Sequence, residues 1–525
     1  MKQFIYILSV ISVMLTSCTD FLDVQREKEP TTGNFFLSDK DADDAMNGIY
    51  YECYYNQYPY GREFFYEITG GSDDFIYGRT RGTDEYNLAN FTYTGREGPL
   101  GIVRNLIRPL TWSNWMIYNL LRKESLTPVE QKRLAEAYFM RAKLHFIFAY
   151  RYGRVDNGFP FDRYEDYDPY IYQPQEQRAT VMENYDLIIQ DLEKAATVLP
   201  FFEEYGEEDY GRAHKAAAWA YMVKTYAYWA QHDPGKWALI PPLVDRIESE
   251  GRRGLLDNFA DVFTMANNWS KEYIWSINNS GTMRTGCVLG GVVIDNQAWG
   301  RFNGWGFFKP TLGLYNEFAE GDRRRRVTML EYGDEFLFFG ELRRFWSTAD
   351  LESGFMLAKY LEPWNYGYVD DAGLGHSPYT NDLNNDLNTP LVRHAEMVLF
   401  KAEALIMNSD GAGAARELNR LTRRAGLGDV YTVATMDDLK HERRCELAGE
   451  YADRFMDLKR WQEWDKLNAP KMGRHHYERS DPDSDWEPVE TWPARNFNPA
   501  TDIAFPYNPD DIINANGKWK QNPVD

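Results

Sequence analysis

The chain of 525 residues is long enough for a large core or several domains, and 58 basic against 80 acidic residues give a formal net charge of −22. So acidic a chain argues against nucleic acid as a partner, because phosphates are bound by clustered Lys and Arg. Aromatic residues make up 16 % of the chain, and 36 tyrosines outnumber 30 phenylalanines, which favours half-exposed ring platforms in addition to a packed core.

The first residues have the pattern of an export signal. Lys2 precedes an apolar run from Phe4 to Leu15, and small residues lead to Cys18. The run is too short to span a bilayer as a stable helix. Leu15-Thr16-Ser17-Cys18 resembles the lipobox of bacterial lipoproteins, in which the cysteine is acylated and becomes the first residue of the mature chain. We therefore expect lipidation at Cys18; the alternative is an ordinary signal peptide with an accidental cysteine.

Helix signals become clear at Thr127. Thr127-Pro128-Val129-Glu130 combines an N-cap residue, a proline in the first turn and a glutamate three residues after the cap. Apolar residues then follow at three- and four-residue steps. This reasoning predicts helices at 127–153, 180–199 and 213–230. Small inward-facing residues and Pro200 after the second helix indicate tetratricopeptide-like pairs, degenerate because an insert from 153 to 177 breaks the period.

Between residues 254 and 390 the helical periodicity fades, and Gly, Asn, Trp and Tyr become dense. Irregular stretches of this length inside a compact protein are usually functional. Helices are predicted again at 393–407, 412–424 and 436–451, the last with Thr435 as its N-cap. The tail from Asn468 onward is again loop-like.

Catalytic and metal-binding motifs are poor. Cys53, Cys287 and Cys445 are far apart and lack metal-ligand spacing, so we expect buried free thiols. The sequence contains no nucleophile elbow, zinc-protease motif or P-loop. The acidic segment 481–485 and the Asn/Asp run 381–388 are interpreted as solvated loops rather than calcium sites. We expect no cofactor, no bound metal and no enzymatic activity.

The strongest signature is "HERRCELAGEYADRFMDLKRW" at 441–461. It resembles the C-terminal signature of the SusD/RagB family, the surface nutrient-binding lipoproteins of Bacteroidetes. Further blocks agree in the family's order, and together they cover nearly the whole chain: "FLD" at 21–23, "SDD" at 72–74, "AYFMRAKLHFIFAYRYG" at 137–153, "NEFAEGDRRRR" at 316–326, "RHAEMVLFKAEALI" at 393–406, and the closing "FPYNPDDIINAN" and "QNP". One departure is "FPYNP", where the family more often shows Pro-Ile-Pro.

The resemblance implies a mainly α fold, a right-handed superhelix of four degenerate tetratricopeptide-like helix pairs with a large irregular, loop-rich insertion. It also implies a partner, a SusC-like TonB-dependent outer-membrane transporter over which the lipoprotein sits as a hinged lid. The predicted organisation is a signal peptide at 1–17, a lipidated tether at 18–32 and a single domain at 33–525. That domain divides into a helical part at 33–253, a ligand-binding insertion at 254–390 and the signature part at 391–525.

The charged signature residues are interpreted as structural. They alternate in sign at helical spacing, which predicts buried ion pairs that fix the last helices to the superhelix: Glu442, Arg443, Arg444, Glu446, Glu450, Asp457, Arg460, with Trp461 beside them. Glu396 and Glu403, seven residues apart on one helix, are expected to serve packing as well. For the Arg323–Arg326 run we favour a turn and helix start over a clamp for glycan carboxylates.

A glycan site needs flat aromatic faces together with amides, carboxylates or guanidinium groups for the hydroxyls. Two clusters have this composition, and the resemblance implies that the second lies in the N-terminal part of the same site as the first. The first is Asn296, Trp299, Arg301, Phe302, Asn303 and Trp305, and the second is Asp73, Asp74, Tyr77, Arg79, Arg81 and Tyr86. Trp346, Trp364 and Tyr366 are weaker candidates, and Trp112 and Trp115 are expected in the core.

The leading hypothesis is a lipid-anchored surface protein that binds oligosaccharides and delivers them to the transporter. A binding protein for peptides or another nutrient in the same lid role is the alternative, since the fold does not fix the ligand. A secreted glycoside hydrolase and a scaffold that binds only protein are lower-ranked hypotheses.

Overall fold

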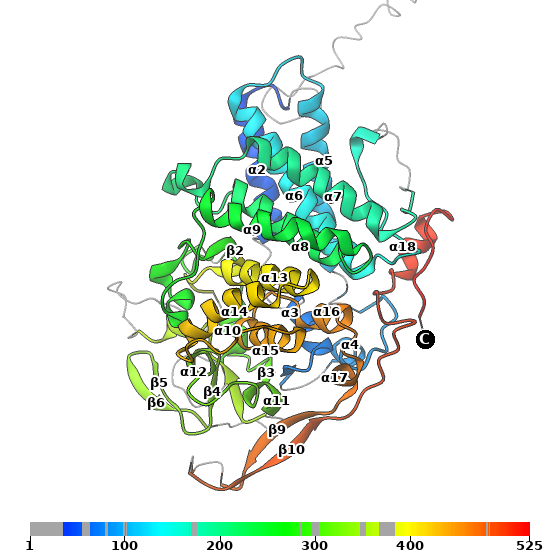
Figure 1. Cartoon of the computed structure of the whole chain (residues 1–525). Coiled ribbons are helices and arrows are strands. Elements are labelled where there is room, and N and C mark those ends of the chain that lie inside the picture. Colours follow the sequence, from blue (N-terminus) through cyan, green and yellow to red (C-terminus); the bar gives the residue numbers. More distant parts are fainter. Residues whose placement is uncertain are drawn as a thin grey trace, which may run out of the picture.

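The computed structural model describes residues 35–54, 64–78, 82–97, 100, 102–166, 169, 176–283, 285–295, 304–346, 353–366, 384–478, 481 and 483–524. Within these residues the chain is mainly helical, with short strands that lie mostly in the lower part of the view (Figure 1). The predicted signal, tether and lipidated Cys18 lie outside the described residues. None of the described helices combines the length and apolar character that crossing a bilayer requires.

Four helix pairs form the helical part of the molecule, and each of these helices packs against the next helix of the set. This confirms the prediction of a mainly α fold built from tetratricopeptide-like pairs. The pairs are α2 (Asp39–Tyr54) with α5 (Ile102–Leu121), α6 (Pro128–Tyr152) with α7 (Val181–Val198), α8 (Lys215–Trp229) with α9 (Ile240–Ser249), and α13 (His394–Met407) with α14 (Gly411–Ala425).

Local capping explains where several helices begin. Thr127 forms both halves of a capping box with Glu130, and the side chains of Thr180 and His214 accept from the third residue after each cap. The predicted helix at 436–451 is too long, because α15 (Met436–Leu447) ends before Gly449. Gly449 has φ +77°, and a Cβ there would lie 2.6 Å from Leu357, so the chain turns at a residue that only glycine fills without strain.

The structure also corrects the expectation for one tryptophan. Trp112 was predicted to lie in the core, but 39 % of it is exposed on α5, where its ring covers Gly48 of α2. A helical context alone does not tell which face of the helix a residue occupies. Trp115 is half-buried, and its ring lies edge-on to Tyr164.

Apart from α15, the remaining elements form a loop-rich head, which we define as the described residues of 64–97, 254–393 and 454–524. Its strands pair two by two, all antiparallel: β1 (Phe75–Ile76) with β3 (Lys309–Pro310), β2 (Tyr273–Ile277) with β8 (Thr389–Arg393), β4 (Met329–Glu331) with β7 (Phe355–Leu357), β5 (Glu335–Phe338) with β6 (Glu341–Arg344), and β9 (Lys471–His476) with β10 (Trp486–Trp492). Its short helices are α3 (Phe64–Gly71), α4 (Thr83–Asn90), α10 (Leu289–Val293), α11 (Leu312–Tyr315), α12 (Arg323–Thr328), α16 (Arg454–Arg460), α17 (Trp464–Asn468) and α18 (Pro509–Asn514).

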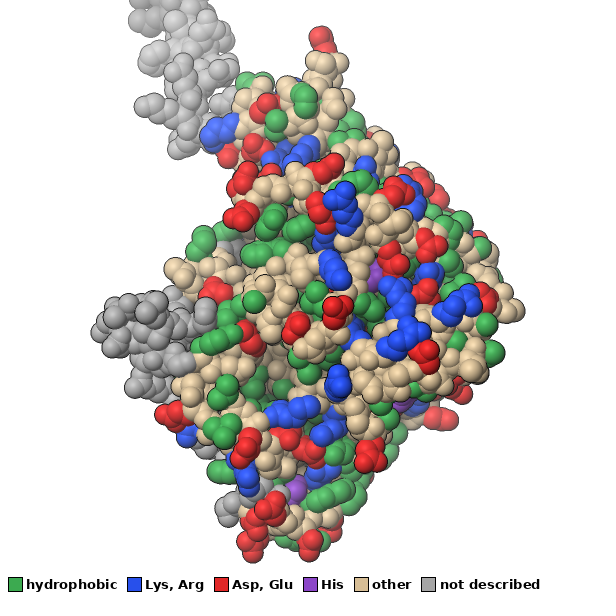
Figure 2. All heavy atoms as spheres, turned by 60° about the vertical axis from the view of Figure 1, so that its left-hand side comes forward, with side chains coloured by type: hydrophobic (Ala, Val, Ile, Leu, Met, Phe, Trp, Pro, Cys, Tyr) green, Lys and Arg blue, Asp and Glu red, His purple; other side chains and the backbone are tan. Residues whose placement is uncertain are grey.

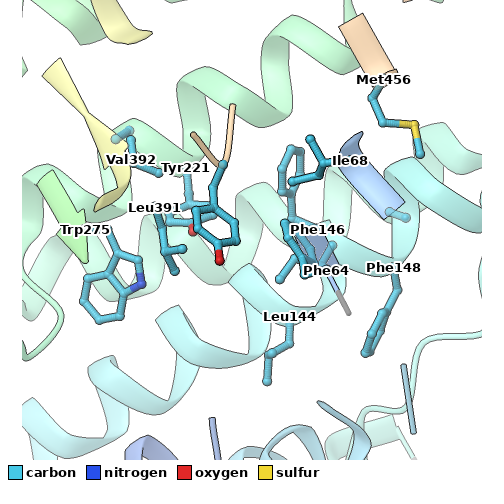
Figure 3. Packing of buried hydrophobic residues seen from close by; sticks show 14 of the residues in the cluster. Phe64, Ile68, Leu144, Phe146, Phe148, Tyr221, Trp275, Leu391, Val392 and Met456 are labelled. Carbon is cyan, nitrogen blue, oxygen red and sulfur yellow. The ribbon is translucent and has the colours of Figure 1, made fainter. Parts of the chain in front are cut away.

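One apolar core joins the helix pairs to the head (Figure 3). Phe64 and Ile68 of α3 lie beside Phe146 of α6, while Trp275 of β2 contributes from the other side. The Trp275 ring lies 4.8 Å from that of Phe139 on α6. Because aromatic side chains bury large areas, this shared core holds the head rigidly against the helices.

The ion pairs predicted for the signature residues are confirmed. Arg393, at the end of β8, is bonded to Glu272, Glu446 and Glu450, all of them buried. Burial alone would raise the pKa of Glu446, but the guanidinium groups of Arg424 and Arg393 outweigh it and lower that pKa to about 2. The network therefore stays ionised at neutral pH.

The other structural assignments are also confirmed. Glu396 pairs with Lys224 and Arg443, and Glu403 accepts from Arg460 at 2.8 Å and from the Trp461 indole at 2.9 Å. The Arg323–Arg326 run starts helix α12, capped by Asp322, and Arg324 is buried against Glu442 at 2.7 Å. Cys53, Cys287 and Cys445 are free and buried.

Candidate ligand-binding site

Among the described residues, the segment that carries Trp305 of the first cluster lies beside the segment that carries Asp73, Asp74 and Tyr77 of the second. Strand β1 follows Asp73 and Asp74, and it pairs with β3, which follows Trp305. The register joins Phe75 to Pro310, and the amide of Phe308 donates to the carbonyl of Tyr77 at 3.2 Å. Segments far apart in the sequence thus meet at one place in the head.

Asp73 and Asp74 are held by arginines of the signature helices. Arg454 donates two hydrogen bonds to Asp73, at 2.9 and 3.0 Å, and Arg444 donates one to Asp74 at 2.7 Å. Burial would raise the pKa of Asp73, but Arg444 and Arg454 outweigh it and hold that pKa well below its usual range. These carboxylates connect the segment before β1 to α15 and α16. That they also contact a ligand remains a prediction.

Tyr77 is buried, and its hydroxyl donates to the carbonyl of Tyr66 at 3.2 Å. It belongs to a chain of ring contacts that we call the ring ladder: Trp305, Phe307, Tyr66, Tyr77, Trp492 and Tyr86. Successive ring centroids are 5.7, 5.9, 5.2, 5.9 and 5.9 Å apart. Offset and edge-on contacts at these distances are the favoured arrangements of aromatic pairs. Both ends reach the surface, because Trp305 is half-buried and Tyr86 is 51 % exposed.

Buried cations fix the backbone beneath the ladder. Lys471 donates to the carbonyls of Gly70 and Phe75, at 3.1 and 2.7 Å, and Arg495 donates to that of Gly70 at 2.9 Å. Both positive charges lie at the C-terminal end of α3, where the helix leaves carbonyls without intrahelical partners. Burial lowers the pKa of Arg495 to about 10. A single basic residue in the tail has no recognisable sequence motif, so the structural roles of Lys471 and Arg495 were not predicted.

The remaining predicted members are Arg79, Arg81, Asn296, Trp299, Arg301, Phe302 and Asn303, which lie outside the described residues. Their role in ligand binding stays a prediction. Among the weaker candidates, Trp364 is fully buried and Tyr366 is 41 % exposed. Trp346 is half-buried.

Three side chains, a cysteine, a histidine and a glutamate, follow one another in space as in a nucleophilic catalytic site. Cys445 Sγ lies 4.0 Å from His441 Nε2, and His441 Nδ1 lies 2.7 Å from Glu317 Oε1. However, the Cys445 thiol is buried, and burial raises its pKa well above its usual range, which disfavours the thiolate that a nucleophile needs. Among the described residues no three His, Cys, Asp or Glu side chains are grouped to hold a metal ion.

The architecture is that of a helical repeat protein with a rigid, ring-bearing head. Two family models match the chain: one described as the SusD family over residues 267–524, and one described as starch-binding and associating with the outer membrane over residues 20–227. The chain belongs to the SusD family.

Relatives align over nearly the full length. A SusD-like protein of Bacteroides ovatus is 22 % identical over 566 aligned positions, which cover 100 % of this chain and 97 % of the relative. A SusD-like protein of Bacteroides fragilis has a similar structure, with a TM-score of 0.78, 19 % identity and coverage of 94 % and 98 % of the two chains. Surface glycan-binding protein A of Bacteroides thetaiotaomicron, solved with laminarihexaose, has a TM-score of 0.71, 19 % identity and coverage of 92 % and 99 %.

Proposed function

We propose that this protein is a lipid-anchored surface protein that binds oligosaccharides and delivers them to a SusC-like TonB-dependent outer-membrane transporter. The ring ladder is the observation that carries the proposal, because its two ends, the half-buried Trp305 and the 51 % exposed Tyr86, reach the surface on a support of buried rings within a SusD-family chain. A similar structure was solved as a laminarihexaose complex, which supports glycans as the ligand class. Cys18 supplies the anchor in this proposal.

The energetics suit capture followed by release. Burying ~70 Å² of apolar surface against one sugar ring contributes about 2 kcal/mol at ~25 cal/mol/Å². Two or three such contacts give roughly millimolar to micromolar affinity once the costs of association are deducted. A ligand bound at this strength is retained at the surface and can still leave for the transporter.

Truncating the exposed ends of the ladder is expected to weaken binding. In Trp305→Ala and Tyr86→Ala, each lost stacking face should raise the dissociation constant for a bound glycan about tenfold or more. Titration calorimetry against a panel of laminarihexaose, maltohexaose and cellohexaose measures this. Tyr86→Ala should leave Tm nearly unchanged because its ring is 51 % exposed.

Tyr477→Ala is the matched control, since this tyrosine is 60 % exposed at the far end of the β9–β10 hairpin and lies outside the ladder. Unchanged binding in both ladder variants would place the site elsewhere. Retention of peptides in place of glycans would favour the other nutrient class, and released reducing ends would indicate a hydrolase.

The anchor is tested separately. Several acyl chains on one cysteine give stable membrane attachment, because each buried methylene adds ~0.8 kcal/mol. Cys18→Ala should therefore move the protein from the membrane fraction to the soluble fraction of the cell, as measured by fractionation and immunoblotting. Persistent membrane attachment of this variant would refute lipidation at Cys18.

A further inference from the structure

A concave feature, separate from the ring ladder, lies at the C-terminal end of α2, on the side of the molecule that Figure 2 turns forward. Figure 2 shows hydrophobic side chains (green, a class that includes tyrosine) grouped below the uppermost part of this face. Three segments enclose an open cleft of about 350 Å³: the last turns of α2, residues 208–212, and the end of β2 with the turn that follows it. This volume lies at the small end of the range of about 300–1,000 Å³ typical of ligand pockets.

Four tyrosines line this cleft, which we call the tyrosine cleft: Tyr50, Tyr51, Tyr54 and Tyr210. None of them belongs to the ring ladder. Tyr51 is 51 % exposed, and the other three are half-buried, so each keeps part of its surface accessible to solvent. Flat, partly exposed rings with polar tips stack on the apolar faces of sugars, whereas a cleft for a purely apolar ligand would be lined by aliphatic groups.

The rings rest on a rigid floor. Tyr50 and Tyr54 lie 6.4 and 6.3 Å from the buried ring of Trp275, and the Tyr54 hydroxyl accepts from the Trp275 indole at 2.9 Å and from Lys143 at 3.0 Å. On the opposite wall the Tyr210 ring lies 5.7 Å from that of Trp269. A cleft whose walls are fixed before binding loses less entropy when a ligand enters.

The residues of the opposite wall are also closely packed. Gly211 has φ +96°, and a Cβ at this position would lie 1.8 Å from the Asn278 side-chain nitrogen. Asn278 itself donates to the carbonyl of Tyr210 at 3.0 Å and accepts from the Trp269 indole at 3.0 Å. The absence of a side chain at Gly211 thus lets the loop that carries Tyr210 approach the end of β2.

At the tyrosine cleft, acidic groups outnumber the one cation among the described lining residues. The Arg212 guanidinium donates to Asp209 at 2.6 Å, to Glu136 at 3.2 Å and to Asn47 at 2.7 Å. Glu208 adds an exposed carboxylate to the lining. An anionic ligand would therefore meet a cation already paired with two carboxylates, on a chain of net charge −22. The lining favours an uncharged ligand rich in hydroxyl groups.

We propose that the tyrosine cleft is a second carbohydrate-binding site, separate from the ring ladder, that holds a short segment of an uncharged oligosaccharide. Tyr51 and Tyr210 provide stacking faces on opposite walls, and Asn47 and Glu208 lie where sugar hydroxyls are to be bonded. The site rests on geometry that does not involve the ladder, so it stands or falls separately from the ladder assignment.

The test uses the mature chain and titration calorimetry with laminarihexaose, maltohexaose and cellohexaose, and with trigalacturonate as the anionic probe. In a Trp305→Ala/Tyr86→Ala background, binding of at least one uncharged probe should remain, and trigalacturonate should not bind. Adding Tyr51→Ala and Tyr210→Ala should then raise the remaining dissociation constant at least about tenfold. Tyr477→Ala in the same background is the matched control and should change nothing.

The outcomes separate the two sites. Remaining binding that is insensitive to the Tyr51 and Tyr210 changes, or a background variant that binds no probe while the wild type does, overturns the second site and leaves the proposed function in place. Binding lost through the tyrosine cleft alone supports this site and refutes the ladder assignment. A wild-type chain that binds none of the uncharged probes overturns both. A Tm within a few degrees of wild type, about the shift that one kcal/mol produces, shows that the variants are folded.

Discussion

Arg393→Met should destabilise the protein by about 3–5 kcal/mol, because it removes one positive charge from a buried network in which Glu272, Glu446 and Glu450 then share only the remaining cations. The Arg393 guanidinium is 2 % exposed and bonds to Glu272 at 2.8 Å, to Glu446 at 2.7 Å and to Glu450 at 2.5 Å. No other side chain in the described structure contacts all three carboxylates. Chemical unfolding at pH 7 gives the free-energy difference directly.

Two further variants sharpen this measurement. Arg246→Met removes the surface pair with Glu250, whose side chains are 49 % and 47 % exposed, and should cost no more than about 1 kcal/mol. Arg393→Lys should recover only part of the lost stability, because a lysine cannot reproduce the planar fork that reaches several acceptors. Equal, small effects of the buried and the exposed variant would contradict a stabilising network.

Lys459→Met should stabilise the protein, and the gain should depend on pH. Lys459 is 3 % exposed, no described residue accepts a hydrogen bond from its amine, and its Nζ lies 4.0 Å from the ring centroid of Phe455 and 4.6 Å from that of Phe505. Burial lowers the pKa of Lys459 from 10.5 to about 7. Folding therefore favours the neutral amine, whereas the unfolded chain carries the protonated one at neutral pH.

The pH window follows from these two values. Above pH 10.5 the amine is neutral in both states, and ionisation of Lys459 costs no stability. As the pH falls from 10.5 toward 7, only the unfolded state takes up the proton, so the wild type loses stability relative to the methionine variant by up to about 5 kcal/mol, at 1.36 kcal/mol per pH unit. Below pH 7 the difference levels off.

Thermal and chemical unfolding of both proteins between pH 6 and 10 measures this difference. Lys466→Met is the control, because the Lys466 side chain is 43 % exposed and should show no such trend. A stability difference between wild type and Lys459→Met that stays constant over this range would show that the amine is charged in the folded state throughout.

Helices with strong end signals were predictable from the sequence, whereas those without such signals were not. The capping box at Thr127 gave the start of α6 to within one residue. The helices α2 and α9 were not predicted, and for α5 only a helical context around Trp112 and Trp115 was recognised. Pro109 lies inside α5, where a proline normally argues against a helix, and the apolar face of α2 comprises only four buried positions. Helix α9 is short, and Pro241-Pro242 in its first turn is compatible with a helix start.

The candidate site was only partly predictable, for a different reason. The local sequence composition identified Tyr77, Tyr86 and Trp305 as candidate site residues, and the structure joins these three in one ladder. It gave no sign that Phe307, Tyr66 and Trp492 complete that ladder, because contacts between distant segments leave no local pattern. The same holds for the arginines that pair with Asp73 and Asp74, and for Tyr50, Tyr51, Tyr54 and Tyr210 of the tyrosine cleft.

The β1–β3 pairing and the contact of Tyr77 with Trp492 make the head depend on the first, middle and last parts of the chain at once. Closing such long loops costs entropy before any contact is made, so these pairings form late in folding. A chain that ends before β10 therefore has no completed ladder. Under the proposed function, such an unfinished chain would lack one of its ring contacts and would not yet bind ligand at the ladder.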